Sequence, residues 1–284
     1  MKMYGQKLCL STNDTFGLSD KEQILLFKKT GFEGFFTMWY PGYDEGVAEC
    51  AALARNEGMI YQSLHAPWNY CGDMWDENEK EDAQKGVEQY KHCIDVCAKN
   101  DIPILVSHVF VGFDVPYVPT EFGLENFSKV IEHAEKAGVK IAFENTEGEQ
   151  YLDAVLSNFR NSDAVGFCWD TGHQMCYNFS HNLMDKYSDL LIATHLNDNL
   201  GVKDYSGKIT WHDDLHLLPF DGIADWQDIT SRIKKSGYSG ILTFELNNKS
   251  KPNRHENDKY FKMPVEEYVA ECYVRACKVA NLCK

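Results

Sequence analysis

Short apolar runs alternate with longer amphipathic stretches along the whole sequence. Eight of these runs have the length and the β-branched or aromatic content that is typical of strands. They cover residues 7–11, 34–38, 59–64, 102–108, 140–144, 165–170, 192–196 and 241–246. Several are almost continuously apolar, as in 104–106 and 241–244, which favours parallel strands that are buried on both faces.

Amphipathic patterns with a helical period fill the intervals between these runs. Ser19 and Glu22 form an S-x-x-E capping box, which predicts the start of the first helix. Pro264 stands where the last helix is expected to begin. Glycines follow four of the predicted helices where each should end before the next strand, at Gly31, Gly58, Gly138 and Gly237.

Eight βα units in one uninterrupted series predict a closed barrel. A (β/α)8 barrel needs about 250 residues, so we expect residues 1–284 to form a single TIM barrel domain. An open doubly wound sheet is the alternative, but neither G-x-G-x-x-G nor G-x-x-x-x-G-K-[ST] occurs. The longest irregular segments, 199–224 and 247–263, both follow strands, and we expect them to cover the active face.

Net charge and cysteine content limit the classes of partner and the cellular compartment that we expect for this protein. The 43 acidic and 28 basic residues leave a net charge of −15, which disfavours nucleic acid and anionic lipid as partners. The N-terminus has no apolar segment, and no stretch approaches the roughly 20 apolar residues of a membrane span. The ten cysteines include no CxxC pair and are expected to be small buried side chains. We therefore expect a cytoplasmic protein with reduced thiols and no membrane partner.

Potential metal ligands stand where six consecutive predicted strands end. The carboxyl ends of parallel barrel strands meet at one rim, so these side chains should converge there. Burying so many ionisable groups is costly unless they are paired or bind a metal, and imidazoles with carboxylates suit Zn²⁺, Mn²⁺, Fe²⁺ or Co²⁺. In chain order the candidates are His65, His108, Glu144, Asp170 with His173, His195, then Asp214 and His216 of the next loop, and Glu245.

Each of these residues is weak evidence by itself. A single histidine at a strand end is more often a hydrogen-bonded core residue, and a single aspartate there often caps the following turn. The prediction rests on the repetition of these residues in register with the strands. His92 and His133 fall in predicted helices and are expected at the surface, whereas His212 stays ambiguous because it is close to Asp214.

The motifs LHAPW, VSHVF, AFENTEG, WDTGH, THLND, DDLH and TFELN resemble, in order and spacing, those of the xylose-isomerase-like barrel superfamily. That superfamily includes sugar-phosphate isomerases and epimerases and the apurinic-site endonuclease IV group. The resemblance to the epimerases implies one divalent metal held by Glu144, Asp170, His195 and Glu245, with Glu144 and Glu245 as acid–base catalysts. The segment HLLPFDGIADW also resembles an epimerase loop, H-x-x-P-G-x-G-x-x-D-W, although Phe220 and Asp221 replace its usual Gly-x pair.

The endonuclease IV group adds ligands and holds three zinc ions, so the resemblance leaves the number of metals between one and three. Its motifs have counterparts here, and the implied additional metal or substrate ligands are His65, His108, His173, Asp214 and His216. This group is the reason to keep a metal-dependent phosphodiesterase acting on abasic DNA as the alternative function. Such an enzyme needs a basic track for the duplex, which the net charge does not favour.

The first hypothesis is a divalent-metal isomerase or epimerase that acts on a sugar, an inosose or a sugar phosphate. A carboxylate would transfer a proton at the carbon beside a carbonyl, with Zn, Mn, Mg, Fe or Co stabilising the enediolate. The relatively basic segment 248–262 is expected to be a lid that grips a sugar phosphate, or else a solvated loop. A homo-oligomer stays open. The expected substrate-binding residues are Trp39, Trp68, Phe110 and Asn197.

Overall fold

The computed structural model describes residues 5–113, 116–202 and 208–284, so residues 1–4 of the N-terminus and 203–207 of the segment 199–224 lie outside it. Within this part, eight parallel strands form one sheet in the order β7-β6-β5-β4-β3-β2-β1-β8. A parallel bridge between Leu196 and Phe244 joins the two edges and nearly closes the barrel. The strands are β1 Leu8–Ser11, β2 Gly34–Met38, β3 Ile60–His65, β4 Ile104–His108, β5 Lys140–Glu144, β6 Val165–Asp170, β7 Leu191–His195 and β8 Leu242–Phe244.

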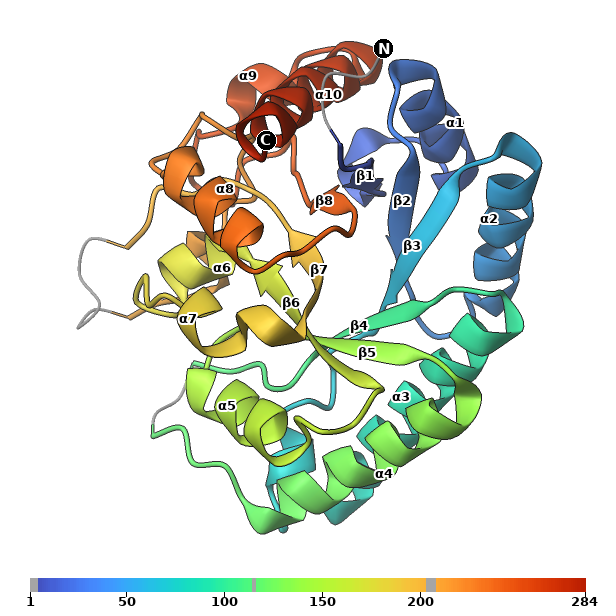
Figure 1. Ribbon diagram of the computed structural model, residues 1–284, viewed down its shortest axis with the longest axis vertical. Helices are drawn as coiled ribbons and strands as arrows, with labels where there is room; N and C mark the ends of the chain where they lie inside the picture. Colours follow the sequence, from blue (N-terminus) through green and yellow to red (C-terminus); the bar gives the residue numbers. More distant parts are fainter. Residues whose placement is uncertain (1–4, 114–115, 203–207) are drawn as a thin grey trace.

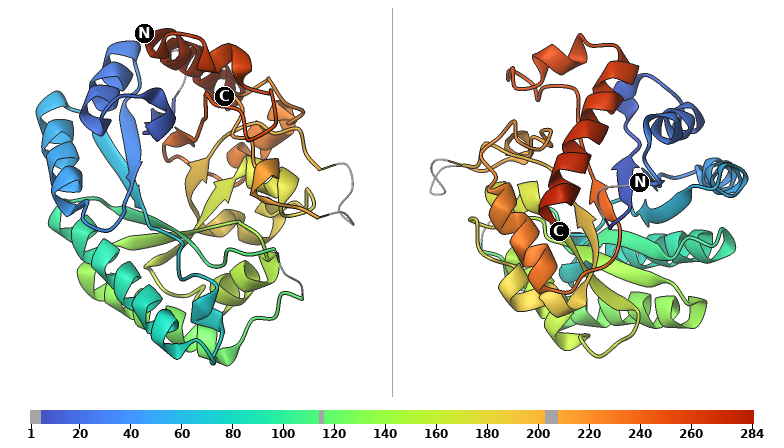
Figure 2. Two further views of the ribbon diagram at one scale, coloured as in Figure 1. Left: turned by 180° about the vertical axis from the view of Figure 1, so that it is seen from behind. Right: turned by 45° about the horizontal axis from the view of Figure 1, so that its top comes forward.

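Helices surround the strands on the outside of the barrel (Figure 1). The last long helix packs beside the first, which completes the ring of helices, and Figure 2 shows the same arrangement from two further sides. The single (β/α)8 barrel predicted from the sequence is thereby confirmed, and the open doubly wound sheet is wrong. The described helices are α1 Asp20–Thr30, α2 Asp44–Glu57, α3 Lys80–Lys99, α4 Glu121–Ala137, α5 Glu149–Asn158, α6 Thr171–Cys176, α7 Met184–Tyr187, α8 Trp226–Lys235, α9 Asp258–Phe261 and α10 Val265–Leu282.

Local sequence signals account for several of the helix ends. The capping box of Ser19 and Glu22 is present at the start of α1. Gly138 ends α4 at φ 71°, a left-handed conformation that costs glycine little because it has no Cβ atom. Two helix limits lie one residue away from the expected positions. The cap of α8 is Ser236, one residue before the expected Gly237, and α10 begins at Val265, one residue after Pro264.

The interior of the barrel is built in layers because side chains alternate between the two faces of a strand. A small cluster of Val106, Ala142, Cys168 and Ala193 fills one layer inside the barrel. Two residues further along each of these strands stand His108, Glu144, Asp170 and His195. The apolar layer is therefore the floor beneath the predicted ligands, while the larger core lies between the strands and the helices.

No described helix combines the length and the apolar content that a membrane span requires. None of the ten cysteines, all of which lie in the described part of the chain, forms a disulfide, and eight of them are buried and two partly buried. Their burial agrees with the expectation that they serve mainly as small apolar side chains.

Candidate metal centre and substrate cavity

A cavity of about 510 Å³ opens at the carboxyl ends of the strands. Its wall contains most of the predicted ligands, namely His65, His108, Glu144, His173, Asp214, His216 and Glu245. Another hollow of similar volume lies among residues that begin the strands and contains no histidine or cysteine in its wall. The first cavity is therefore the one with the chemistry of an active site.

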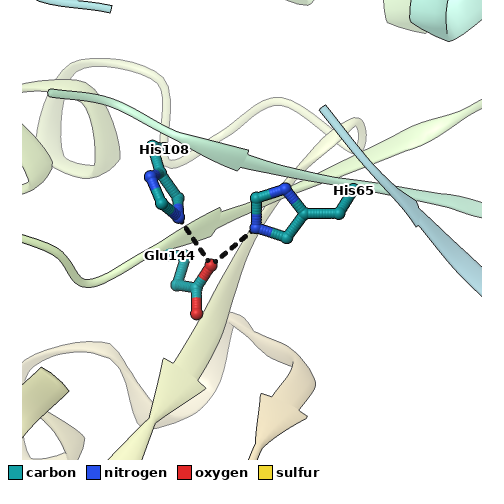
Figure 3. A group of neighbouring side chains, drawn as sticks. All are labelled: His65, His108 and Glu144. Carbon is teal, nitrogen blue, oxygen red and sulfur yellow. Dashed lines mark hydrogen bonds and ion pairs between the residues drawn. The ribbon is translucent and has the colours of Figure 1, made fainter. Parts of the chain in front are cut away.

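One group of ligands consists of His65, His108 and Glu144 (Figure 3). The Nε2 atoms of the two histidines lie 3.1 Å and 3.2 Å from Oε2 of Glu144. Nδ1 of His65 donates a hydrogen bond to the carbonyl oxygen of Ala66 at 2.7 Å. In the neutral imidazole the Nε2 atom is then an acceptor that faces a carboxylate oxygen. Such a contact is favourable only when a proton or a metal cation lies between the two atoms.

The same arrangement recurs in a second group, formed by His173, Asp214 and His216. Nδ1 of His173 lies 3.0 Å from the carbonyl oxygen of Asn145, and Nδ1 of His216 lies 3.2 Å from that of Glu245. Their Nε2 atoms approach Oδ2 of Asp214 at 3.6 Å and 2.7 Å. Metal-binding histidines typically donate their second ring N–H to a carbonyl or carboxylate in this way.

A third group brings together Glu144, Asp170, His195 and Glu245, with one potential ligand atom of each residue within 4.8 Å of the others. Nδ1 of His195 lies 2.8 Å from Glu144 Oε1 and 2.9 Å from Glu245 Oε2. Asp170 is oriented through both oxygens: the backbone N–H of His173 donates to Oδ1 at 2.6 Å, and the amide of Asn197 donates to Oδ2 at 2.8 Å. Because Glu144 belongs to the first and third groups, the two groups share a carboxylate.

Cys168 forms a further group with Glu144 and His195, one layer deeper in the barrel. Burial raises the pKa of this thiol to about 12, although the charge of His195 acts in the opposite direction. A neutral thiol is a poor metal ligand, because the thiolate is the coordinating form. The cysteine therefore belongs to the floor of the site.

The protonation of the histidines shows how strongly the site requires positive charge. Burial alone lowers the pKa of a histidine, yet Asp170 and Asp214 raise the pKa of His173 well above its usual value. For His216 burial is likewise outweighed by Asp214 and Glu245, and its pKa rises to about 9. Without a metal these imidazoles hold protons that offset the carboxylates, and divalent cations can supply the same charge.

Basic side chains do not meet that requirement. In the described part of the chain no lysine or arginine forms an ion pair with Glu144, Asp170 or Glu245. Among the described lysines and arginines only Lys251, whose Nζ atom lies 3.8 Å from Asp214 Oδ2, belongs to the cavity wall. The side-chain nitrogen His195 Nε2 and the oxygen Asp214 Oδ1 are buried and have no hydrogen-bond partner there. Donor types, orienting hydrogen bonds and these buried atoms without partners all fit one to three divalent metal ions.

The predicted substrate wall is only partly reproduced by the cavity. Trp68 lies in the wall and stacks on the ring of His108, with ring centres 5.5 Å apart. Trp39 does not line it: its side chain is buried and donates a hydrogen bond from Nε1 to Asp44 at 2.7 Å. Phe110 instead stacks on Tyr151, with ring centres 4.2 Å apart, and it lines a neighbouring depression.

Asn197 is also absent from the wall, because it is fully buried behind Asp170. The structure therefore places it as an orienting partner of a candidate ligand.

The histidines that were not expected to be ligands lie outside the cavity. His92 lies on the exposed face of α3, where it contacts Asp44, and His133 lies partly exposed on α4, where it contacts Asp95. The ambiguous His212 lies in a short 3-10 helix, Trp211–Asp213, and it is not a member of the cavity wall.

Several cavity residues were not anticipated from the sequence. The aromatic wall includes Phe113, Tyr177 and Trp211, and a buried carboxyl group, Glu147, lies beside them. Lys251 was anticipated only as one member of a basic segment. The available signal for Glu147 was its place three residues after Glu144, but the direction of a loop side chain is not encoded in a short pattern.

Comparisons with known proteins agree with this geometry. The sequence model of the xylose isomerase-like TIM barrel family matches residues 24–263. A relative, the uncharacterised protein y4fM of Sinorhizobium fredii, is 36% identical over 174 residues. That alignment covers 57% of this chain and 53% of the relative, so the chain spans about half the length of the relative.

Solved structures show the same fold. The IolI protein, solved with a bound zinc atom, has a TM-score of 0.75 at 18% identity, with 96% of this chain and 98% of IolI covered. An L-ribulose 3-epimerase has a TM-score of 0.70 at 15% identity, covering 97% of this chain and 95% of its own. The match of the family to most of the sequence, on a barrel with the expected rim, establishes that this chain belongs to the xylose isomerase-like TIM barrel family.

Proposed function

We propose that this protein is a divalent-metal-dependent isomerase or epimerase of a sugar, an inosose or a sugar phosphate, acting as one domain over residues 1–284. The observation that carries the proposal is the convergence of Glu144, Asp170, His195 and Glu245 within 4.8 Å, three of them at the ends of barrel strands. Glu144 and Glu245, together with the aromatic wall, line a cavity of about 510 Å³, a volume that suits a small polyol.

Glu144 and Glu245 are the proposed acid–base pair. They come from β5 and from the end of β8, which are not adjacent in the barrel, so they approach a bound sugar from different sides. The side chain of Glu245 is 22% exposed and can reach the substrate, whereas that of Glu144 is fully buried among His65, His108 and His195. Glu245 is therefore the stronger candidate for taking the proton from carbon.

The bound metal, its proposed ligands and the aromatic wall make the remaining contributions to the reaction. When bound, a divalent cation makes the C–H bond beside the carbonyl more acidic by polarising the carbonyl and the neighbouring hydroxyl group. Asp170 and His195 hold their places through hydrogen bonds and burial, while Trp68, Phe113 and Tyr177 exclude water from the cavity. The relatives support this assignment in outline, since the structural neighbours include an L-ribulose 3-epimerase and a zinc-bound IolI.

The direct test is proton exchange. The protein is incubated with a panel of ketoses, inososes and their phosphates in deuterated water, and each sugar is analysed for deuterium at carbon by NMR. We expect one class of sugar to exchange and to convert to its isomer. Elemental analysis of the same protein should find a divalent metal. Absence of both metal and exchange would contradict the proposal.

A second function is favoured by one specific observation: the groups centred on Glu144 and on Asp214 supply ligands for more than one metal. Adjacent metals suit the hydrolysis of phosphoesters, because they can stabilise both the attacking and the leaving oxygen. The chain carries a net charge of −15, which disfavours a DNA duplex as the substrate. Nicking of a duplex that contains an abasic site, without deuterium exchange into any sugar, would reverse the order of the two proposals.

A further inference from the structure

Lys251 occupies an unusual position in the segment after β8. It is the single lysine or arginine among the described residues of the cavity wall, and only 15% of its side chain is exposed. Its Nζ atom lies 5.3 Å above the ring centre of Trp211, which also lines the cavity. The backbone N–H of Lys251 donates to Glu256 Oε1 at 2.8 Å, which holds this part of the segment in place.

The ammonium group of Lys251 retains its hydrogen-bonding capacity. Its nearest acidic neighbour is Asp214, whose Oδ2 lies 3.8 Å from Nζ, a distance that is too long for a hydrogen bond. The contact with the face of Trp211 is electrostatic and uses no N–H group as a conventional donor. Within the part of the chain that the structure describes, the three N–H donors of Lys251 are thus left for a ligand or water.

Neighbouring basic residues of the same segment are engaged or point away. Arg254 donates to Oδ1 of Asp213 at 2.6 Å, which ties the segment to the loop that carries Trp211. Lys259 forms an ion pair with Asp221 at 3.1 Å. Lys249 is exposed and absent from the cavity wall. Lys251 is therefore distinguished from them by facing the cavity with its donors available.

Charge complementarity decides what this position can bind. Most ionisable groups in the wall are carboxyl groups or histidines, so the deeper part of the cavity attracts cations. A single ammonium group above an aromatic ring creates a local site of the opposite sign, where an anionic oxygen can accept hydrogen bonds. Trp211 below it presents an apolar surface to the carbon chain of the same ligand.

We propose that Lys251 and Trp211 form a subsite for an anionic group of the substrate, a phosphate or a carboxylate. This inference rests on the proposed function for the remainder of the substrate, whose carbonyl end would lie at Glu144 and Glu245. The substrate class is then a phosphorylated or acidic sugar, and neutral sugars would lack the contact that anchors the distant end.

The test compares the wild-type protein with Lys251→Met, which keeps an unbranched side chain as far as the ε position and removes the charged ammonium group. Lys249→Met is the matched control, because it removes the same charge from the same segment outside the cavity. In the first arm, inorganic phosphate is titrated into each metal-loaded protein by calorimetry. We expect about a 10-fold to 100-fold loss of phosphate affinity in Lys251→Met, the effect of losing one charge-assisted hydrogen bond, and less than a twofold change in the control.

The second arm measures kcat/KM for a neutral sugar, its phosphate and the corresponding sugar acid. Lys251→Met should lower the ratio of kcat/KM for one of the two anionic sugars to kcat/KM for the neutral sugar, which identifies the anionic group, while Lys249→Met should leave this ratio unchanged. Equal phosphate affinity in the wild type and Lys251→Met, or no phosphate binding by the wild type, would overturn the subsite. Loss of phosphate binding without turnover of any sugar would instead keep the subsite and refute the proposed function.

Discussion

Glu147 gives the protein a specific dependence of stability on pH. Its side chain lies in the cavity wall and only 7% of the residue is exposed. Burial raises the pKa of its carboxyl group from 4.5 to about 7, and the negative charge of Asp214 acts in the same direction. Hydrogen bonds from the backbone and the charge of His173 oppose this shift without cancelling it. The folded protein therefore holds a proton on Glu147 that the unfolded chain has already released near pH 6.

The magnitude follows from the shift in pKa. Between 4.5 and about 7 the difference is about 2.5 units, and each unit corresponds to about 1.4 kcal/mol, so the effect is about 3 kcal/mol. The sign is that of a carboxyl group whose pKa is raised by folding. The full stability is present below pH 4.5, declines as the pH rises toward 7, and is about 3 kcal/mol lower above pH 7.

The assay is urea unfolding of metal-free protein at pH 5 and pH 8, because a bound cation near His173 and Asp214 would alter the pKa of Glu147. The perturbation is Glu147→Gln, which removes the titrating proton and keeps the shape of the side chain. Relative to the wild type, this variant should gain about 2.5 kcal/mol in its free energy of unfolding between pH 5 and pH 8, because part of the effect is already lost at pH 5. Glu125→Gln, on the exposed face of α4, is the matched control for the loss of one carboxyl group. If the free energies of the wild type and Glu147→Gln change in parallel with pH, Glu147 is ionised in the folded protein and the reasoning fails.

Three further predictions concern the metal centre and the proposed chemistry. Glu245→Gln should abolish turnover while the circular dichroism spectrum stays that of the wild type; full activity in this variant would remove Glu245 from the mechanism. Metal binding should release protons, because the Asp214 carboxylate outweighs burial and raises the pKa of His216 to about 9, so affinity should increase as the pH rises from 7 to 9. Calorimetry in buffers of different ionisation enthalpy measures this release, and identical heats in all buffers would contradict it. Asn197→Ala should weaken metal binding about 10-fold to 100-fold, since the hydrogen bond that orients Asp170 is lost, and unchanged affinity in a metal titration would show that Asp170 needs no such support.

The rim of the barrel is the part of this protein that the sequence alone determines most fully. Parallel strands end at the same face, and side chains two residues apart on a strand point to the same side. His108, Glu144, Asp170 and His195 therefore had to converge once the strands were recognised, and the structure places them above a floor of small apolar side chains. The limits of β2, β5 and β6 match the predicted ones, and those of the other strands differ by one or two residues, which leaves this convergence unchanged.

Tertiary packing decided which side chains outside the strands reach the cavity. Trp39 follows β2 directly and Phe110 stands two residues after the end of β4, yet Asp44 and Tyr151 hold them away from the cavity. Trp211 reaches the cavity from the long loop after β7, where no periodic pattern indicates the direction of a side chain.

The charge of the site was likewise decided by packing. The pKa values of Glu147 and His216 depend on burial and on carboxylates that are distant in the sequence, such as Asp214 for Glu147 and Glu245 for His216. Strand alternation is a local property that the order of residues specifies directly. Loop direction and electrostatic environment depend on contacts between distant segments, and these exist only after the barrel has closed.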